Sequence, residues 1–297
     1  MTLSQFDTLT KINLDDLVGM FGWEHRPVLS CLLRRLFVGP ARTFAQHMTD
    51  FDRAVGQVGL GEASRQMLRA HYVQDLRIHG RENLPASGPA LFLSNHPGMV
   101  DTFSLFAAIN LPDLHVIGLH RPFLVALPNL ANRLFFVSEV DSERVRAIRQ
   151  VSNHLRNGGT VLTFPAGEIE PDPAIHRDAA GWLDQWNDSA GVFIRLARDT
   201  KIVPVLVRGV FWEKAVRHPL TRIKQTRLER EKLAVAIQSL PMITRNLRPT
   251  TVHVSFARPI TLDEIGSTDT SAIHKVILER MHGLIENPPK GEGVSAL

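Results

Sequence analysis

A histidine and an aspartate five residues apart form the first pair in this sequence that could do chemistry together. His96 directly follows the apolar run of residues 90–95, and Asp101 lies just beyond the turn-forming pair Pro97-Gly98. If a helix begins after this turn, the Asp101 carboxylate lies in its first turn and can accept the second N–H of the imidazole. The free ring nitrogen can then take a proton from a hydroxyl. The spacing therefore predicts a His–Asp general base in a loop between a strand and a helix.

The structural alternative is that Asp101 only caps a helix while His96 is solvated. A bare H-x4-D pattern is weak evidence, because His47 and Asp52 match it as well. That second match falls in a segment with a helical pattern, where residues five apart point about 140° away from each other. We therefore expect only His96 and Asp101 to meet.

The sequence motifs offer no enzyme nucleophile for His96 to activate. There is no G-x-S-x-G elbow, and the single cysteine, Cys31, falls in a helical segment. We therefore expect His96 to activate the hydroxyl of a substrate, which predicts direct transfer to that hydroxyl without a covalent intermediate on the enzyme.

A second loop of interest follows the apolar run of residues 159–165. Residues Phe164 to Glu168 read F-P-A-G-E, and Gly167 lets backbone N–H groups approach an anion or a developing oxyanion. The alternative is an ordinary β-turn with no chemical role.

Short apolar runs alternate with helical patterns from residue 76 onward. The predicted strands are residues 76–80, 90–95, 115–119, 134–139, 159–165, 201–209 and 251–257. The predicted helices include residues 59–73, 100–110, 122–131, 142–157, 188–199 and 271–286. This alternation predicts an α/β fold with a mixed, partly parallel central sheet flanked by helices. Sites in such sheets form at the carboxyl ends of strands, so we expect the two loops to meet there.

Residues 1–75 are predicted to form a helical N-terminal segment, and residues 76–290 an α/β domain followed by a mobile tail. Residues 26–44 mix apolar residues with four arginines, and Pro40 is expected to break that helix. Such a composition is typical of an amphipathic helix at a membrane interface, but an ordinary helix packed on its own domain fits it too. The basic stretch 208–232 fits either a solvated helical face or a phosphate- or membrane-facing patch.

Composition limits the classes of function. A hydrophobic fraction of 44% and a charged fraction of 22% are typical of a globular protein, and the formal net charge of +4 suits an anionic partner. One cysteine excludes an intrachain disulfide and fits a reducing compartment. The first residues lack a signal-peptide pattern and no apolar run is long enough to span a bilayer, so we expect any membrane contact to be peripheral or monotopic. Without zinc-ligand spacing or a nucleic-acid-binding motif, neither a metal nor nucleic acid is expected.

Taken together, these segments resemble the PlsC-type glycerolipid acyltransferases. Residues 95–101 (N-H-P-G-M-V-D) resemble the family's first motif, N-H-x4-D, and residues 164–168 resemble its third, usually F-P-E-G-T-R. Residues 202–209 (I-V-P-V-L-V-R-G) resemble its fourth motif, the apolar strand around V-P-V. The resemblance covers residues 75–260, with three motifs in the family's order. The F-P-A-G-E form is closest to a hemolysin-like subgroup linked to acylation of lysophospholipids or lyso-ornithine lipids.

Two departures from the family pattern bear on the acceptor. The stretch that corresponds to the second motif, residues 134–146, lacks its arginine, which Arg144 or Arg146 of the next predicted helix could replace. Ala166 stands where the third motif has glutamate, Glu168 follows two residues on, and the Thr-Arg pair is missing. In the family these basic positions are associated with gripping the phosphate of glycerol 3-phosphate, so the acceptor stays open among lyso-lipids.

The resemblance implies an O-acyltransferase that moves a fatty acyl group from acyl-CoA or acyl carrier protein to the hydroxyl of a lysophospholipid, lysophosphatidate or lyso-ornithine lipid. It implies no cofactor beyond that co-substrate, and peripheral or monotopic contact with the cytoplasmic face of a membrane. His96 would be the base and Asp101 its orienting partner. The expected substrate-binding residues are Asn95, which also braces the loop, Arg121, which is either a phosphate contact or a surface residue, Arg144, Phe164, Pro165, Ala166, Gly167 and Glu168. The alternatives are a thioester hydrolase that uses the same site and a non-catalytic basic membrane-surface protein.

Overall fold

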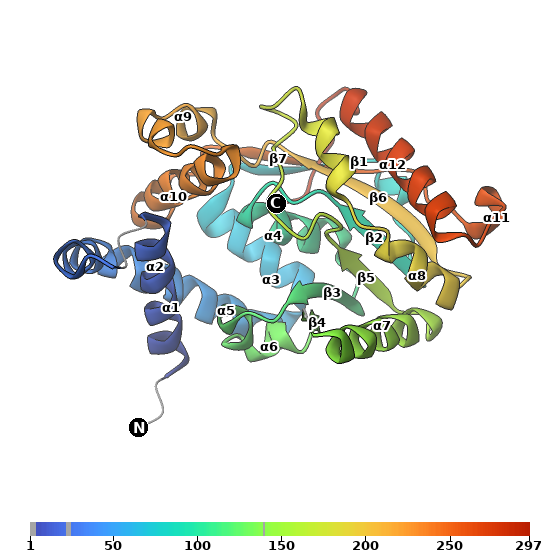
Figure 1. Ribbon diagram of the computed structural model, residues 1–297, viewed down its shortest axis with the longest axis horizontal. Coiled ribbons are helices and arrows are strands. Elements are labelled where there is room, and N and C mark those ends of the chain that lie inside the picture. The colour runs from blue at the N-terminus through green and yellow to red at the C-terminus, as the bar shows by residue number, and fades with distance from the viewer. Residues whose placement is uncertain (1–3, 22–24, 139) are drawn as a thin grey trace.

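A single mixed sheet forms the centre of the molecule (Figure 1). The computed structural model describes residues 4–21, 25–138 and 140–297. Within these residues, the sheet has eight strands in the order β4-β3-β5-β2-β6-β7-β1-β8. Their bounds, in that order, are Leu134–Val137, Leu114–Leu119, Thr160–Thr163, Ala90–Ser94, Lys201–Arg208, Thr251–Phe256, Asp75–His79 and Val294–Ser295.

Neighbouring strands from β4 to β6 all run parallel. β7 runs antiparallel to β6, β1 runs parallel to β7, and β8 lies antiparallel to β1 at the far edge. The carboxyl ends of the parallel strands therefore share one edge of the sheet. The loops after β2 and β5 leave that edge side by side, because these two strands pair directly. The topology confirms the predicted α/β fold with a mixed, partly parallel sheet.

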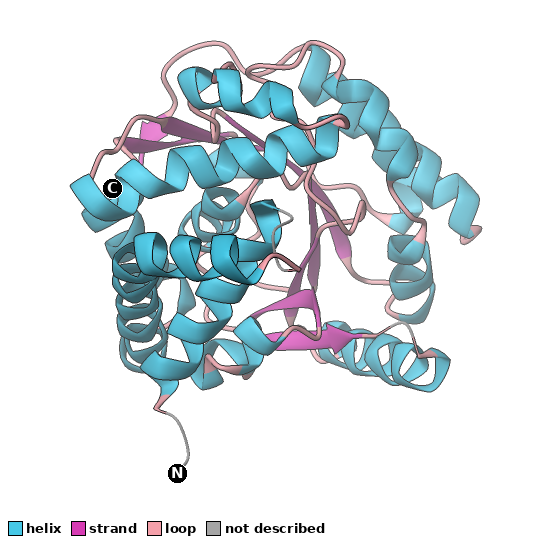
Figure 2. Ribbon diagram, turned by 60° about the vertical axis from the view of Figure 1, so that its left-hand side comes forward, coloured by secondary structure: helices cyan, strands magenta, loops and turns pink. Residues whose placement is uncertain are grey.

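Helices cover both faces of this sheet (Figure 2). Along β2, Ala90 and Phe92 pack into one hydrophobic cluster, and Leu91 and Leu93 pack into another on the opposite face. Because both faces are buried, the central strands read as continuous apolar runs. The first cluster includes residues of α2 (Pro27–Val58), α3 (Leu60–Met67) and α4 (Met99–Ile109), and the second includes residues of α7 (Asp141–Arg156), α8 (Ser189–Leu196) and α12 (Thr270–Glu286). The other helices are α1 (Gln5–Phe21), η1 (Leu68–Tyr72), η2 (Arg81–Asn83), α5 (Pro122–Val125), α6 (Pro128–Ala131), η3 (Ala179–Gln185), α9 (Glu213–Val216), η4 (Pro219–Ile223), α10 (Arg227–Arg245) and α11 (Leu262–Ile265).

The N-terminal helices pack directly on the α/β part of the chain. The ring of Phe51 in α2 meets that of Phe103 in α4 edge-on, with centroids 4.9 Å apart. Tyr72, at the end of the π-helical turn η1, stacks on the same phenylalanine with centroids 6.5 Å apart. One hydrophobic cluster therefore runs across the predicted boundary between residues 75 and 76.

Pro40 does not break its helix, so that prediction was wrong. α2 runs without interruption from Pro27 to Val58 and holds Pro40 in its interior. A proline there removes one helical hydrogen bond and costs about 3 kcal/mol. The carbonyl left without its usual partner is that of Leu36, which lies on an exposed stretch of the helix where water can bind it. Burial of Phe51 and its neighbours along the second half of α2 offsets the cost, because tertiary packing outweighs local propensity.

The predicted helix over residues 122–131 is divided into two short helices, α5 and α6. Pro122 and Pro128 each occupy the start of one of them. Proline is favoured at the first helical position, where it has no hydrogen bond to lose, and so the second proline starts a new helix.

The C-terminal tail differs from its prediction as well. Its Gly- and Pro-rich composition indicated mobility, yet Val294 and Ser295 pair with Ile78 and Arg77 of β1. The open edge of β1 supplies backbone partners that composition does not reveal. At the other edge of the sheet, the predicted strand 134–139 is present as β4, and its last predicted residue, Glu139, lies outside the described residues.

Candidate active site

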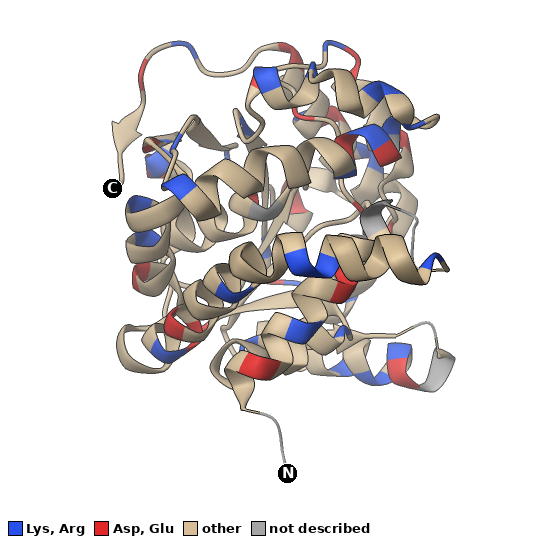
Figure 3. Cartoon of the chain, turned by 90° about the vertical axis from the view of Figure 1, so that its left-hand side faces the viewer, with Lys and Arg blue, Asp and Glu red and all other residues tan. Residues whose placement is uncertain are grey.

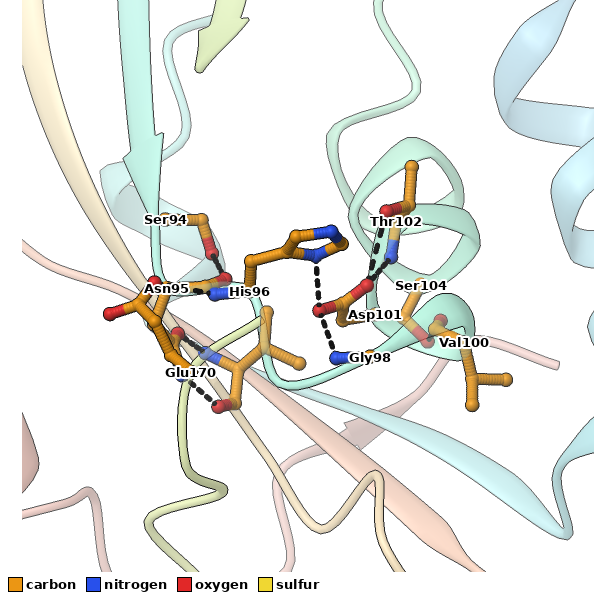
Figure 4. Close-up of polar contacts among 10 residues, drawn as sticks. Ser94, Asn95, His96, Gly98, Val100, Asp101, Thr102, Ser104 and Glu170 are labelled. Atoms are coloured by element: carbon orange, nitrogen blue, oxygen red, sulfur yellow. Dashed lines mark hydrogen bonds and ion pairs between the residues drawn. The ribbon is translucent and has the colours of Figure 1, made fainter. Parts of the chain in front are cut away.

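His96 and Asp101 meet at the carboxyl end of β2 (Figure 4). The His96 Nδ1 atom lies 2.9 Å from the Asp101 Oδ2 atom. His96 belongs to the loop after β2, and Asp101 to the first turn of α4, as the spacing predicts. The carboxylate is completely buried, whereas 27% of the imidazole side chain is exposed. The pair thus combines a fixed, sheltered carboxylate with a ring that solvent or a substrate can reach.

The Asp101 carboxylate also caps the helix that carries it. Oδ2 accepts the backbone N–H of Gly98 at 2.8 Å, and Oδ1 accepts the backbone N–H and the hydroxyl of Thr102. A negative charge is favourable at a helix N-terminus. The structural alternative is therefore right about the cap and wrong about the histidine, because the carboxylate that caps α4 also binds the imidazole.

Several charges act on the imidazole of His96. Burial by itself lowers its pKa, but the charge of Asp101 and the hydrogen bond to it, helped by the charge of Glu170, raise the pKa above the usual 6.5. Arg121 acts in the opposite direction. Because an ionised carboxylate only accepts hydrogen bonds, Nδ1 carries the ring proton of the neutral imidazole, and Nε2 keeps a lone pair that can accept another.

The F-P-A-G-E loop lies beside this pair, as predicted from the two strand ends. The ring of Phe164 stands 4.5 Å from that of His96, centroid to centroid. Pro165 is buried, and its carbonyl oxygen accepts the backbone N–H and the side-chain amide of Asn187. Ala166 packs against the second hydrophobic cluster. Phe164 therefore contacts the imidazole ring, while Pro165 and Ala166 hold the loop in place.

Gly167 forms the tight turn of this loop. Its φ angle of 72° lies in the left-handed region that favours glycine. Its own N–H donates to the Phe164 carbonyl oxygen at 3.0 Å, so the turn uses that group. The neighbouring side chain of Glu168 is exposed. The backbone N–H groups of Ala166 and Glu168 are thus better candidates for an oxyanion than that of Gly167.

Asn95 braces the His96 loop against β6. Its amide oxygen accepts the backbone N–H of Val207, and its amide nitrogen donates to the carbonyl oxygen of Val207, both at 2.8 Å. The side chain is buried. These two hydrogen bonds to the backbone of Val207 fit the bracing role expected of Asn95. A substrate contact by Asn95 stays a prediction.

Two buried acids that sequence reasoning did not single out complete the site's framework. Glu170 accepts the backbone N–H of His96 and the indole N–H of Trp186, each at 2.8 Å. Asp172 accepts four backbone N–H groups, those of residues 174, 209, 210 and 211. Asp172 thereby ties the loop after β5 to the loop after β6. Both acids lie just beyond the F-P-A-G-E stretch, and that proximity is the only signal the sequence offers.

The two predicted arginines lie in different places. Arg121 precedes α5 at the end of β3, and its charge reaches both His96 and Asp16 of α1. Arg144 lies near the start of α7, a helix that packs on β4 and β5. Arg121 is therefore the better placed of the two for an anion beside the imidazole, and a substrate contact by Arg144 stays a prediction.

Cavities and clusters of titratable side chains bear on where a ligand or a metal ion could bind. A small apolar cavity lies next to Gly98 at the start of α4, lined by Val100, Val210, Phe211 and Met242 among others. A larger groove of about 460 Å³ is lined by residues such as Phe256 and Arg258, at the end of the antiparallel strand β7 and so at the opposite edge of the sheet. Among the described residues, no group of three or more His, Cys, Asp and Glu side chains could hold a metal ion.

The sequence of residues 75–208 matches the family model described as Acyltransferase. The matched stretch, which is somewhat less than half of the chain, is similar to an acyltransferase domain. This stretch contains the His96–Asp101 pair and the whole F-P-A-G-E loop. The fold is also similar to the crystal structure of PlsC, a 1-acyl-sn-glycerophosphate (LPA) acyltransferase from Thermotoga maritima, with 16% sequence identity and a TM-score of 0.41 over 95% of this chain and 98% of that one. No curated protein matches the sequence.

Proposed function

We propose that this protein is an acyltransferase that moves a fatty acyl group from a thioester, either acyl-CoA or acyl carrier protein, to the hydroxyl of a lyso-lipid. The acceptor is a lysophospholipid, lysophosphatidate or lyso-ornithine lipid. The observation that carries the proposal is the 2.9 Å contact between the buried Asp101 carboxylate and the partly exposed imidazole of His96. A reachable imidazole with a fixed proton on one nitrogen is suited to deprotonate a hydroxyl with the other.

The proposed reaction proceeds in two steps through a tetrahedral intermediate. The Nε2 atom of His96 takes the proton of the acceptor hydroxyl. At the same time the oxygen of that hydroxyl attacks the thioester carbonyl carbon. Asp101 stabilises the imidazolium that forms. When the carbon–sulfur bond breaks, the imidazolium returns the proton to the leaving sulfur. The products are an ester and a free thiol, and the acyl group is never bound covalently to the enzyme.

The negative oxygen of the tetrahedral intermediate needs hydrogen-bond donors. The turn at Gly167 presents the backbone of Ala166 and Glu168 next to Phe164, whose ring contacts His96. We assign the oxyanion to N–H groups of this turn. One such donor contributes about 3 to 4 kcal/mol to transition-state stabilisation in other acyl-transfer enzymes.

An anionic headgroup fits best near Arg121. Its guanidinium is exposed and close enough to lower the pKa of His96. In this proposal a phosphate pairs with the guanidinium of Arg121 while the acceptor hydroxyl approaches Nε2 of His96. This arrangement supports a phosphate-bearing acceptor, although the family's Thr-Arg pair is missing after Gly167.

Membrane contact is proposed for the first half of α2. Val28, Leu32 and Leu36 follow a helical stripe and are 80%, 63% and 66% exposed. On the other side of the helix, Leu33 and Phe37 pack with α1. Lys and Arg lie along α2 and around α9 on this side of the molecule (Figure 3). An apolar stripe flanked by cations is suited to the surface of an anionic leaflet, which we take to be the cytoplasmic one. Within residues 4–21, 25–138 and 140–297, no helix is both long and apolar enough to cross a bilayer.

An acceptor screen tests the proposal. Wild type and His96→Ala receive labelled acyl-CoA with each lyso-lipid in turn, and ester and free fatty acid are measured separately. We expect wild type to form ester with at least one lyso-lipid and His96→Ala to form none above background. Release of free thiol and fatty acid without ester would favour the thioester hydrolase. Identical behaviour of the two proteins across the panel would contradict the proposal.

A further inference from the structure

The carboxylate of Glu170 is buried beside His96 but is not part of the His96–Asp101 pair. Its Oε2 atom accepts the backbone N–H of His96 at 2.8 Å, and its own backbone N–H donates to the carbonyl oxygen of His96 at 2.9 Å (Figure 4). The indole N–H of Trp186 donates to Oε1 at 2.8 Å. Glu170 is only 3% exposed. Two of these three bonds therefore end on the backbone of His96.

These bonds hold a part of His96 that Asp101 does not reach. Asp101 fixes the ring through Nδ1, whereas Glu170 fixes the backbone from which the ring projects. His96 lies in a loop, between the end of β2 and the start of α4, so its backbone groups have no ladder or helix to join. A displacement of about 1 Å at a reacting group can cost on the order of 100-fold in rate. The backbone anchor thus bears directly on catalysis.

We propose that Glu170 is a positioning residue for acyl transfer: its ionised carboxylate holds the backbone of His96 so that the imidazole meets the acceptor hydroxyl, and its charge supports the imidazolium that forms. The inference rests on the proposed function of the His96–Asp101 pair. It adds a second carboxylate to the site, with a role that differs from that of Asp101.

The ionised form is the one that fits these contacts. Two N–H donors point at the two carboxylate oxygens, so a protonated acid would place its own hydrogen against a donor. Burial raises the pKa of Glu170 to about 7, although the hydrogen bonds from Trp186 and from the His96 backbone lower it. The charge of His96 lowers it further, and that of Asp101 in α4 raises it. Glu170 is thus ionised above a pH of about 7, the form that these hydrogen bonds favour.

The test compares three variants of the full-length protein in the acyl-transfer assay. In E170Q one acceptor oxygen becomes an amide that points at a donor, and the charge is lost. We expect kcat to fall about 10- to 100-fold with KM changed by less than about threefold. The fall of kcat/KM on the acid side of the pH profile, here called the acid limb, should move to lower pH. The reason is that the imidazolium of His96 loses a negative neighbour. E170D keeps the charge, so its limb should stay in place while kcat falls.

E231Q is the matched control. Glu231 is another buried carboxylate, in α10, where it pairs with Arg227. Its replacement should lower the thermal midpoint without moving the acid limb. If E170Q behaves like E231Q, losing stability but leaving the limb in place, Glu170 is only a structural residue and the inference is wrong. Unchanged kcat in a folded E170Q would overturn it too.

A measurement without substrate separates this inference from the proposed function. The His96 imidazole is titrated by NMR, with its signal assigned by its absence in His96→Ala. The pKa of His96 should be lower in E170Q than in wild type, and equal values would overturn the inference even if wild type transfers no acyl group. If E170Q does not fold, W186F removes the indole donor, which raises the pKa of Glu170. The titration of His96 should then shift down, and an unmoved titration would again contradict the proposal.

Discussion

At the scale of the residue, Asp101 connects stability and chemistry through a single carboxylate. Its two oxygens serve Gly98 and Thr102 of the α4 N-terminus and the imidazole of His96 at the same time. A change at this position therefore affects the helix cap and the base together. Asparagine at position 101 separates the two effects. Its amide oxygen can still accept hydrogen bonds for the cap, but its amide nitrogen cannot accept the N–H of the imidazole.

Asp101→Asn should reduce kcat by roughly 10²- to 10⁴-fold, the usual contribution of general acid–base catalysis. The amide N–H2 group would face Nδ1–H and force the ring into the other tautomer, which leaves no lone pair for the acceptor hydroxyl. The stability should fall by only about 1 kcal/mol, because the amide oxygen can still cap α4. Initial rates and a denaturant titration measure the two effects. A variant within tenfold of the wild-type kcat would show that the aspartate is a cap and nothing more.

Residue type and spacing were sufficient to predict the His96–Asp101 contact but not the other two acids. Glu168 and Glu170 are two positions apart in the same loop, yet the first is exposed and the second is buried. What buries Glu170 is Trp186, and what buries Asp172 is the backbone of residues 209–211. Those partners come from distant parts of the chain, so no local pattern could indicate them.

At the scale of the element, α2 has two halves with different surroundings. Its second half is part of the core, and its first half presents an apolar stripe to the outside. The amphipathic composition of residues 26–44 was visible in the sequence. That the helix continues through Pro40 was not, because the compensating contacts lie on α3 and α4.

Replacing both Leu32 and Leu36 with aspartate should weaken binding to vesicles of phosphatidylglycerol and phosphatidylcholine. Each leucine that leaves the lipid interface forfeits about 1.5 kcal/mol or more, roughly tenfold in affinity per position. Both positions are exposed, so the thermal midpoint should change little. Leu196→Asp, at an exposed apolar position on α8, is the control that should bind vesicles like wild type. Equal sedimentation of the double variant and wild type with vesicles would exclude α2 as the docking element.

At the scale of the whole molecule, the N-terminal helices and the sheet share one core. Phe51 and Tyr72 pack on Phe103 of α4, the same helix whose first turn carries Asp101. The alternation of strands and helices predicted the α/β class and the meeting of the two loops. It could not predict the reversed direction of β7, the addition of β8, or the packing across residue 75, since these depend on contacts between segments far apart in the sequence.

A truncated chain that begins at residue 75 should not fold cooperatively. Removing α1 to η1 exposes the α4 face around Phe103 together with buried residues of the sheet. We expect this fragment to bind a hydrophobic dye and to lack a sharp thermal transition, measured by circular dichroism. A cooperative transition near that of the full chain would instead establish residues 75–297 as an independent domain.

The account as a whole depends on His96 acting as a base, and a pH profile tests this most directly. Asp101 and Glu170 raise the pKa of His96 above 6.5, so the protonated ring at low pH cannot accept a proton from the acceptor. The rate of ester formation in a single turnover should therefore fall as the pH decreases through that pKa. We predict that the midpoint of this kinetic limb coincides with the midpoint of the His96 titration measured by NMR. A kinetic midpoint at a different pH from the His96 titration would contradict the account. The same fall in rate in His96→Ala would contradict it too.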